Sequence, residues 1–210
     1  MPFSEQQFFA VFAAYNEAIW PAQIAVYALG LCATALVTRQ DGISGRVISI
    51  ILAAMWLWTG IAYHWLAFAP INRAAYLFGA LFTVQGFVFL RYGLRGTGPR
   101  FGFYNHAAAY AGIALIAYAG IFYPLVGFWT GHRYPETPMF GVTPCPVTLF
   151  TFGLLLLSRE RVPWHVLVIP VLWSLIGGTA AFLLGVVQDW ILLLSGLISA
   201  LLLALRDRNG

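Results

Sequence analysis

The sequence predicts an all-α membrane protein with seven transmembrane helices, on two observations. Apolar residues make up 61% of the 210 residues, charged residues only 9%, and the mean hydropathy is +0.82. A soluble domain carries about 25% charged residues. Apolar runs long enough to cross a bilayer also recur along the chain, separated by short segments that hold the arginines. The lipid bilayer is therefore the expected partner of most of the surface.

Residues 4–18 are expected to form an amphipathic helix lying on the membrane surface. Phe8 and Phe12 belong to a series of apolar residues at helical spacing. Ser4 and Gln7 have the spacing of a capping box, in which each side chain binds the other residue's backbone N–H. A helix of this kind buries its apolar face at the headgroup boundary.

Seven apolar stretches follow, of which five are long enough to cross a bilayer core about 30 Å thick. The five are residues 20–38, 47–68, 74–90, 107–128 and 166–187, and the two shorter ones are residues 146–158 and 190–205. The turn before residue 146 is apolar and is expected to dip into the bilayer ahead of a half-length helix.

The arginines test this count, because short cytoplasmic loops are enriched in them. Nine of the eleven follow the first, third, fifth and seventh stretches: Arg39, Arg46, Arg91, Arg95, Arg100, Arg159, Arg161, Arg206 and Arg208. Only Arg73 and Arg133 fall on the other side. The pattern predicts a multi-pass protein of the cytoplasmic (inner) membrane, with its N-terminus outside and its C-terminus in the cytoplasm.

Composition also excludes some chemistry. The net charge of +4 and the pI near 9.3 do not indicate nucleic-acid binding, because the arginines stand singly between apolar runs. The chain has no lysine, so neither retinal nor pyridoxal phosphate can be held as a Schiff base. Cys32 and Cys145 are expected at different depths and unbridged, and Cys32 is expected to be a buried thiol.

The first and last thirds of the chain show a weak internal similarity. Pro21 and Gly30 are spaced like Pro144 and Gly153, and an offset of 117 residues aligns Trp56 with Trp173, Gly60 with Gly177, Asn72 with Asp189, Gly79 with Gly196 and Arg91 with Arg208. This predicts two parallel three-helix units, residues 20–91 and 144–208, joined by a linker helix at residues 107–128. Such a 3+1+3 plan resembles the topology of the sugar-transporting SWEET family, and the resemblance implies transport.

Several short strings carry a second resemblance. They are Tyr15–Pro21, Tyr63-His64, Gly131–Pro135, Pro144–Pro146 and Phe150–Gly153. With these strings the chain resembles a family of small bacterial integral membrane proteins classed as a domain of unknown function. The resemblance implies no particular activity.

Polar residues within or beside apolar stretches are the candidates for a functional site, because they are costly in a bilayer. Most fall near the predicted outer ends of the helices, where they are expected either to converge on an outward-facing pocket or simply to meet water and headgroups. We take Asn16, Glu17, Trp20, His64, Asn72, Gln85 and Asp189 as the candidate ligand-binding or pathway residues. Gln85 lies in mid-span and is expected to bond a neighbouring helix or to line the pathway.

A metal site is the second candidate, with His64, His132, Glu136 and Cys145 as ligands of a transition metal such as zinc. The signal is weak because nearby prolines favour an extended loop, in which His132 and Glu136 would not share a helix face.

Three functions follow from these sets. The first is binding or transport of a small solute or ion through the outer pocket. The second is a membrane-embedded, hydrolase-like metalloenzyme at the outer face. The third is an accessory or sensor subunit of a membrane complex, or a homo-oligomer, which the aromatic content of 17% favours.

Overall fold

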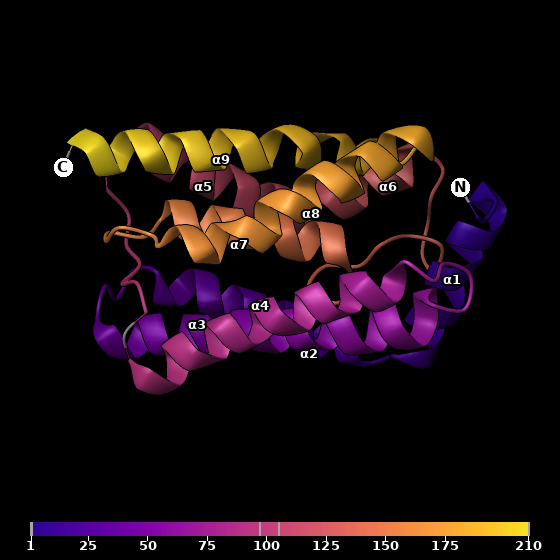
Figure 1. The fold of residues 1–210 in the computed structure, drawn as a ribbon, viewed down its shortest axis with the longest axis horizontal. Helices are drawn as coiled ribbons and strands as arrows, with labels where there is room; N and C mark the ends of the chain where they lie inside the picture. The colour runs from indigo at the N-terminus through magenta and orange to yellow at the C-terminus, as the bar shows by residue number, and fades with distance from the viewer. Residues whose placement is uncertain (1, 97, 105, 210) are drawn as a thin grey trace.

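The computed structural model describes residues 2–96, 98–104 and 106–209, and within those ranges it contains helices and no strand. The long helices run roughly along one axis (Figure 1). In chain order they are α1 (Glu5–Ala18), α2 (Ala22–Leu36), α3 (Gly42–Trp58), η1 (Thr59–Phe68), α4 (Ala75–Arg95), α5 (Ala107–Ala117), η2 (Tyr118–Phe122), α6 (Tyr123–Trp129), α7 (Pro144–Leu156), α8 (Trp164–Leu183), η3 (Val187–Asp189) and α9 (Trp190–Asn209).

Helix α1 has the predicted capping box. The Gln7 N–H donates to Ser4 Oγ at 3.2 Å, and the Ser4 N–H donates to Gln7 Oε1 at 2.9 Å. The helix axis turns by 87° between α1 and α2, so α1 lies across one end of the bundle (Figure 1). Its buried face, with Phe9, Phe12 and Tyr15, packs against η1. A helix thus forms where the sequence predicts one, at Glu5–Ala18 with Ser4 as its cap, and its place on the membrane surface stays a prediction.

Helix α7 forms the centre of the molecule. It lies between a layer formed by α2, α3 and α4 and a layer formed by α5, α6, α8 and α9 (Figure 1), and all of its residues are buried. A helix that is apolar on every side needs such an all-round covering. Its 13 residues span only about 20 Å, in agreement with the half-length helix expected in this part of the chain.

Glycines allow the helices around α7 to approach closely. A Cβ on Gly153 in α7 would lie 2.9 Å from the Gly112 carbonyl oxygen of α5, and a Cβ on Gly112 would lie 2.7 Å from the Gly153 carbonyl oxygen. Small residues at helix contacts are typical of membrane bundles. Between α3 and α7, the buried Trp56 Nε1 donates to Thr151 Oγ1 at 2.9 Å.

Among the residues that the structure describes, five helices are long and apolar enough to cross a membrane, and the bent pair α1–α2 would make six. Helix α7 is apolar but shorter. Seven spans therefore remain a prediction, as does the 3+1+3 plan. Helices α2 and α7 would be equivalent in that plan, yet α7 is wholly buried while α2 buries only Gln23, Gly30 and Ala33.

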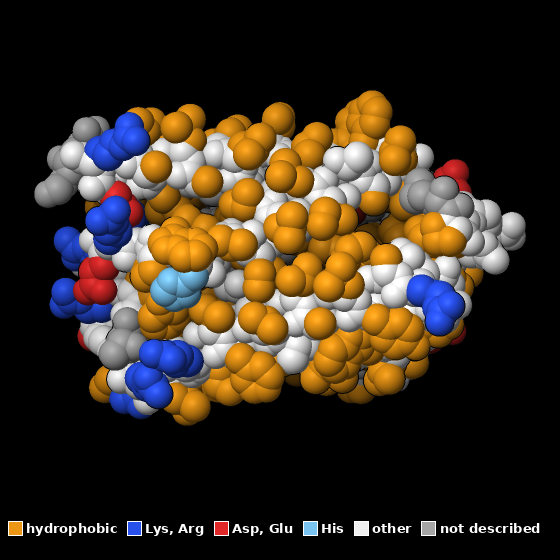
Figure 2. Space-filling view, viewed as in Figure 1, with side chains coloured by type: hydrophobic (Ala, Val, Ile, Leu, Met, Phe, Trp, Pro, Cys, Tyr) orange, Lys and Arg blue, Asp and Glu red, His pale blue; other side chains and the backbone are white. Residues whose placement is uncertain are grey.

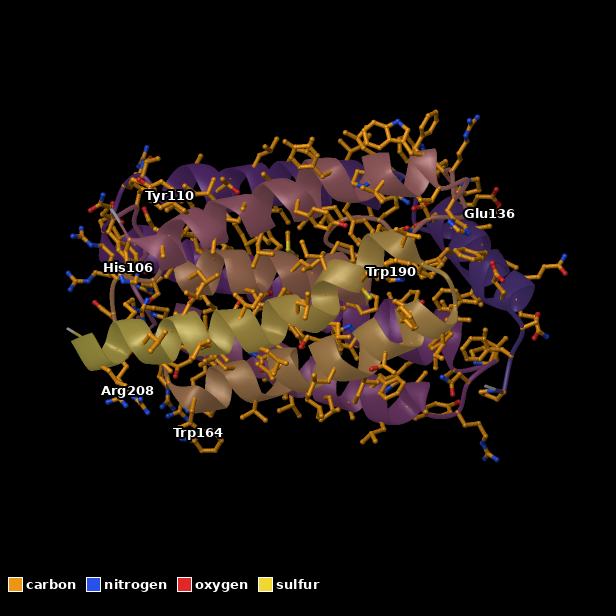
Figure 3. The ribbon with its side chains drawn as sticks, turned by 90° about the horizontal axis from the view of Figure 1, so that it is seen from above. His106, Tyr110, Glu136, Trp164, Trp190 and Arg208 are labelled. Carbon is orange, nitrogen blue, oxygen red and sulfur yellow. The ribbon has the colours of Figure 1, made fainter. Side chains whose placement is uncertain are left out.

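Charged side chains gather at the two ends of the bundle, with an apolar surface between them (Figure 2). We call the end that holds most of the arginines the arginine end. There Arg100 donates to the Glu160 side chain and Arg159 to the Gln40 side chain. Arg206 donates to the Ser158 and Glu160 carbonyl oxygens. His106, Trp164 and Arg208 also lie at this end, and Glu136 lies at the other (Figure 3). The loops in which the sequence concentrates the arginines thus lie together at one end. The side of the membrane that they face stays a prediction.

Two features differ from expectation or were not foreseen. Cys32 is exposed on the apolar surface rather than buried, because α2 lies at the edge of the bundle, while Cys145 is buried; both are free. Segments η1 and η2 are π-helices, a wider turn that occurs frequently at functional sites. Nothing in the sequence pattern indicated them.

Candidate binding cavity at the α1 end

A cavity of about 220 Å³ lies at the end of the bundle where α1 lies, which we call the α1 end. At about 30 Å³ for each water in the liquid, this is room for about seven waters or one small organic molecule. Its walls come from the segment before α1 and from α1, η1, α4, α7, α8 and η3. The surface is hollowed toward this end between the two layers (Figure 2).

His64 lines this cavity from η1 and is completely buried, with 0% of its surface exposed. Neither ring nitrogen has a hydrogen-bond partner. Aromatic rings surround the imidazole, with ring centroids 4.8 Å away in Phe82, 5.1 Å in Trp173 and 5.2 Å in Tyr63. Buried polar groups are normally paired, so an unpaired imidazole at a cavity wall indicates a ligand or water position.

Asp189 enters the cavity from η3 and is 3% exposed. The Tyr123 hydroxyl donates to Asp189 Oδ1 at 2.5 Å. The Cys145 thiol lies beside the same carboxylate. The recorded ion pairs of the described residues do not include Asp189.

A second group of unpaired polar atoms belongs to Thr137 and to Gln188, which precedes Asp189 in the chain. Both amide atoms of Gln188 and the Thr137 hydroxyl are buried without partners, although the Gln188 carbonyl accepts from the Tyr118 hydroxyl at 2.8 Å. The Gln188 amide and the Thr137 hydroxyl both lie beside Gly127 of α6. The polar surroundings of Asp189 therefore continue toward the loop between α6 and α7.

The structure brings four of the predicted residues to the cavity: His64, Asn72, Cys145 and Asp189. Asn72 is half-buried, and its Oδ1 accepts from the Ala74 N–H at 3.1 Å at the start of α4. The side chain thus caps the turn at the start of α4 and also lines the cavity.

Three predicted residues near α1 lie elsewhere. Asn16 is buried and donates to the Pro135 and Thr137 carbonyl oxygens at 2.6 and 2.8 Å. Glu17 is exposed, and Trp20 is 58% exposed. Asn16 thus ties the outer loop to α1, whereas the side chains of Glu17 and Trp20 point to the surroundings and do not line the cavity.

Gln85 is also away from the cavity, in the core. Its amide donates to the Val166 carbonyl oxygen at 3.1 Å, which links α4 to α8. The bond to a neighbouring helix that its mid-span place predicts is confirmed.

The four predicted metal ligands do not all come together: His64 and Cys145 line the cavity, whereas His132 and Glu136 do not. His132 stacks on Phe9 with ring centroids 4.0 Å apart, and Glu136 is exposed in a loop that is not helical, as its prolines predict. Across the described ranges, no three His, Cys, Asp or Glu side chains are close enough to hold a metal ion. The arrangement therefore gives no support to a metal-dependent enzyme.

Sequence reasoning missed Tyr63, Tyr123 and Trp173 as site residues. Tyr63 and Trp173 line the cavity, and Tyr123 holds Asp189. Apart from the Tyr63-His64 string and the alignment of Trp173 with Trp56, their sequence signal is a polar group on an aromatic ring inside an apolar stretch, which needs a partner when buried. Six of the eight tryptophans and six of the ten tyrosines lie inside the predicted stretches and carry this signal, so it does not single out these three.

A fold of apolar helices around a buried helix, with a largely apolar cavity at one end, defines a helical protein suited to the membrane. The chain belongs to a family of unknown function, DUF6064, whose pattern it matches over residues 5–209. Neither the curated proteins nor the solved structures contain a match to the chain.

Proposed function

We propose that the chain is an integral membrane protein that binds a small solute in the cavity at the α1 end. The observation that supports this most is the pair of unpartnered ring nitrogens of His64, buried at the wall of an empty space of about 220 Å³. Leaving buried polar groups unpaired costs about 1–3 kcal/mol. A ligand that donates or accepts a hydrogen bond there recovers that free energy.

The arginine pattern gives the cavity a direction. Because nine arginines mark the predicted cytoplasmic side, the α1 end faces outward, and solute enters from outside the inner membrane. Toward the arginine end the cavity is closed by packed core side chains such as Trp56, Phe82 and Leu149, each at most 1% exposed. In this arrangement a transport cycle requires a second state in which that core opens.

A cavity-filling variant tests binding. Ala180 lines the cavity from α8, and its neighbour Thr179 is exposed and does not. In lipid nanodiscs, a panel of small alcohols, amides, amines and carboxylates is screened for a rise in unfolding temperature. We expect at least one class to stabilise the wild type and Thr179→Phe but not Ala180→Phe. If no solute distinguishes wild type from Ala180→Phe, the proposal is wrong.

Flux separates transport from binding alone. In proteoliposomes, a solute identified by the panel is followed across the bilayer for wild type and for Ala180→Phe. Transport predicts uptake by the wild type that Ala180→Phe abolishes. Binding without uptake assigns the protein to a receptor or sensor role.

A further inference from the structure

We propose that the solute taken by this cavity is a small organic ammonium ion, an inference that rests on the proposed solute-binding function. Three observations on separate residues support it: a buried carboxylate, a wall of aromatic rings and an unpaired imidazole. Each supplies a different part of the recognition of such a cation.

The carboxylate is that of Asp189. It is almost fully buried, it lines the cavity, and no arginine lines the cavity with it. A buried charge is stable only when it is paired or strongly hydrogen-bonded. The hydrogen bond from Tyr123 favours the ionised form and burial opposes it, and no ion pair within the described residues balances the charge. A cationic ligand completes this pair.

Aromatic side chains make up much of the remaining wall. Seven of them line the cavity: Phe3, Phe8, Phe12, Tyr63, Phe68, Phe78 and Trp173. A cation within about 6 Å of an aromatic ring face is attracted to it, and the attraction grows when water is excluded. Aromatic walls around one carboxylate suit a cation with a methylated or otherwise apolar surface better than a hydrated metal ion, which requires several oxygen ligands.

His64 adds a polar contact at the same wall. A neutral imidazole has one nitrogen that accepts a hydrogen bond and one that donates, and both nitrogens are unpartnered here. An ammonium N–H, or a hydroxyl on the cation's carbon chain, is a suitable donor. The site therefore selects a cation with a short polar arm over a purely apolar one.

A charged and a neutral ligand of the same shape test the inference. Choline and its uncharged isostere 3,3-dimethylbutan-1-ol differ in the positive charge and keep the hydroxyl. Affinities are measured in nanodiscs by calorimetry for wild type, Asp189→Asn and Glu17→Gln, the last being an exposed carboxylate outside the cavity. We expect choline to bind the wild type at least about tenfold more tightly than the isostere.

The two variants test whether the preference for choline over the isostere depends on Asp189. Asp189→Asn is expected to bring the two affinities within about threefold of each other, and Glu17→Gln to leave the preference of the wild type unchanged. A preference that persists in folded Asp189→Asn overturns the role of Asp189. If Asp189→Asn does not fold, the two ligands on the wild type still decide.

Failure of this inference differs from failure of the proposed function. Equal affinity for choline and the isostere overturns the ammonium class but leaves solute binding standing. The same holds if neither binds and the alcohols, amides or carboxylates of the solute panel, but not the amines, stabilise wild type and not Ala180→Phe. If no class does so, solute binding and the ammonium inference fall together.

Discussion

At the residue scale, burial and hydrogen bonding separate the polar residues of the α1 end into two kinds. Asn16 is satisfied by backbone groups of the outer loop, whereas His64 is buried without any partner. Sequence alone placed both near the outer end but did not distinguish them, because the distinction depends on which atoms meet after folding. The first kind holds the fold together, and the second is available to a ligand.

Asn16→Ala tests the structural role of Asn16. Two carbonyl oxygens of the outer loop lose their donor, so we expect the free energy of unfolding to fall by about 1–3 kcal/mol. Glu17→Ala is the matched control and is expected to change it by less than about 0.5 kcal/mol. The measurement is reversible unfolding in detergent. An equal effect of both changes would show that the loop bonds contribute little.

Asp41 predicts a local pH dependence. Its carboxylate caps α3, and the Ser44 N–H, donating at 2.6 Å, lowers the pKa of Asp41 below its usual value near 3.8. A carboxyl whose pKa is lower in the folded state than in the unfolded state stabilises the fold when the pH is above the unfolded-state pKa. This stabilisation is lost as the pH falls through the folded-state pKa. We therefore expect Asp41→Asn to lose less stability than wild type between about pH 5 and about pH 2. Equal losses of stability in wild type and Asp41→Asn over this pH range would contradict the prediction.

At the element scale, periodicity and capping rules located the helices, but packing set their roles. The capping box of α1 and the short helix α7 agree with expectation because both depend on local sequence. The complete burial of α7, the exposure of Cys32 and the π-helical turns of η1 do not follow from local sequence, since they depend on neighbouring helices. Since η1 carries His64, the geometry of the candidate site was the part least open to prediction.

A pair of glycines tests how closely the helices must approach. Gly153→Ala places a methyl group against α5 and is expected to lower the free energy of unfolding by about 1–3 kcal/mol. Gly120→Ala in η2 meets no atom within 4 Å, and we expect no loss and a gain of up to about 1 kcal/mol. Thermal unfolding of the two variants side by side gives the comparison. A tolerated Gly153→Ala would mean that α5 and α7 pack less tightly than described.

At the scale of the whole molecule, the apolar middle and the two charged ends make the bundle suited to a bilayer, and the site lies at the end with fewer arginines (Figure 2). The loops that the arginine count grouped together do meet at one end. That arrangement was predictable because alternation of sides follows from counting helices. The side of the membrane that the site faces is set by how the protein inserts into the membrane.

Cysteine labelling tests the orientation. In a Cys32→Ala background, Glu136→Cys lies in an exposed loop at the α1 end, and Phe103→Cys lies in an exposed segment at the arginine end. With a membrane-impermeant maleimide on cells whose outer barrier has been opened, we expect Glu136→Cys to react at once. Phe103→Cys should react only after the inner membrane is permeabilised. The reverse pattern would place the cavity on the cytoplasmic side.

The most direct test of the central claim locates a bound cation in the cavity. Arsenocholine has the charge, the trimethylated head and the hydroxyl arm of choline, and its arsenic gives an anomalous signal in crystals of the protein. We predict one peak inside the cavity, among His64, Trp173 and Asp189, that is absent in Ala180→Phe crystals. The absence of a peak in the cavity at saturating arsenocholine, or a peak only at the outer surface, would contradict the account.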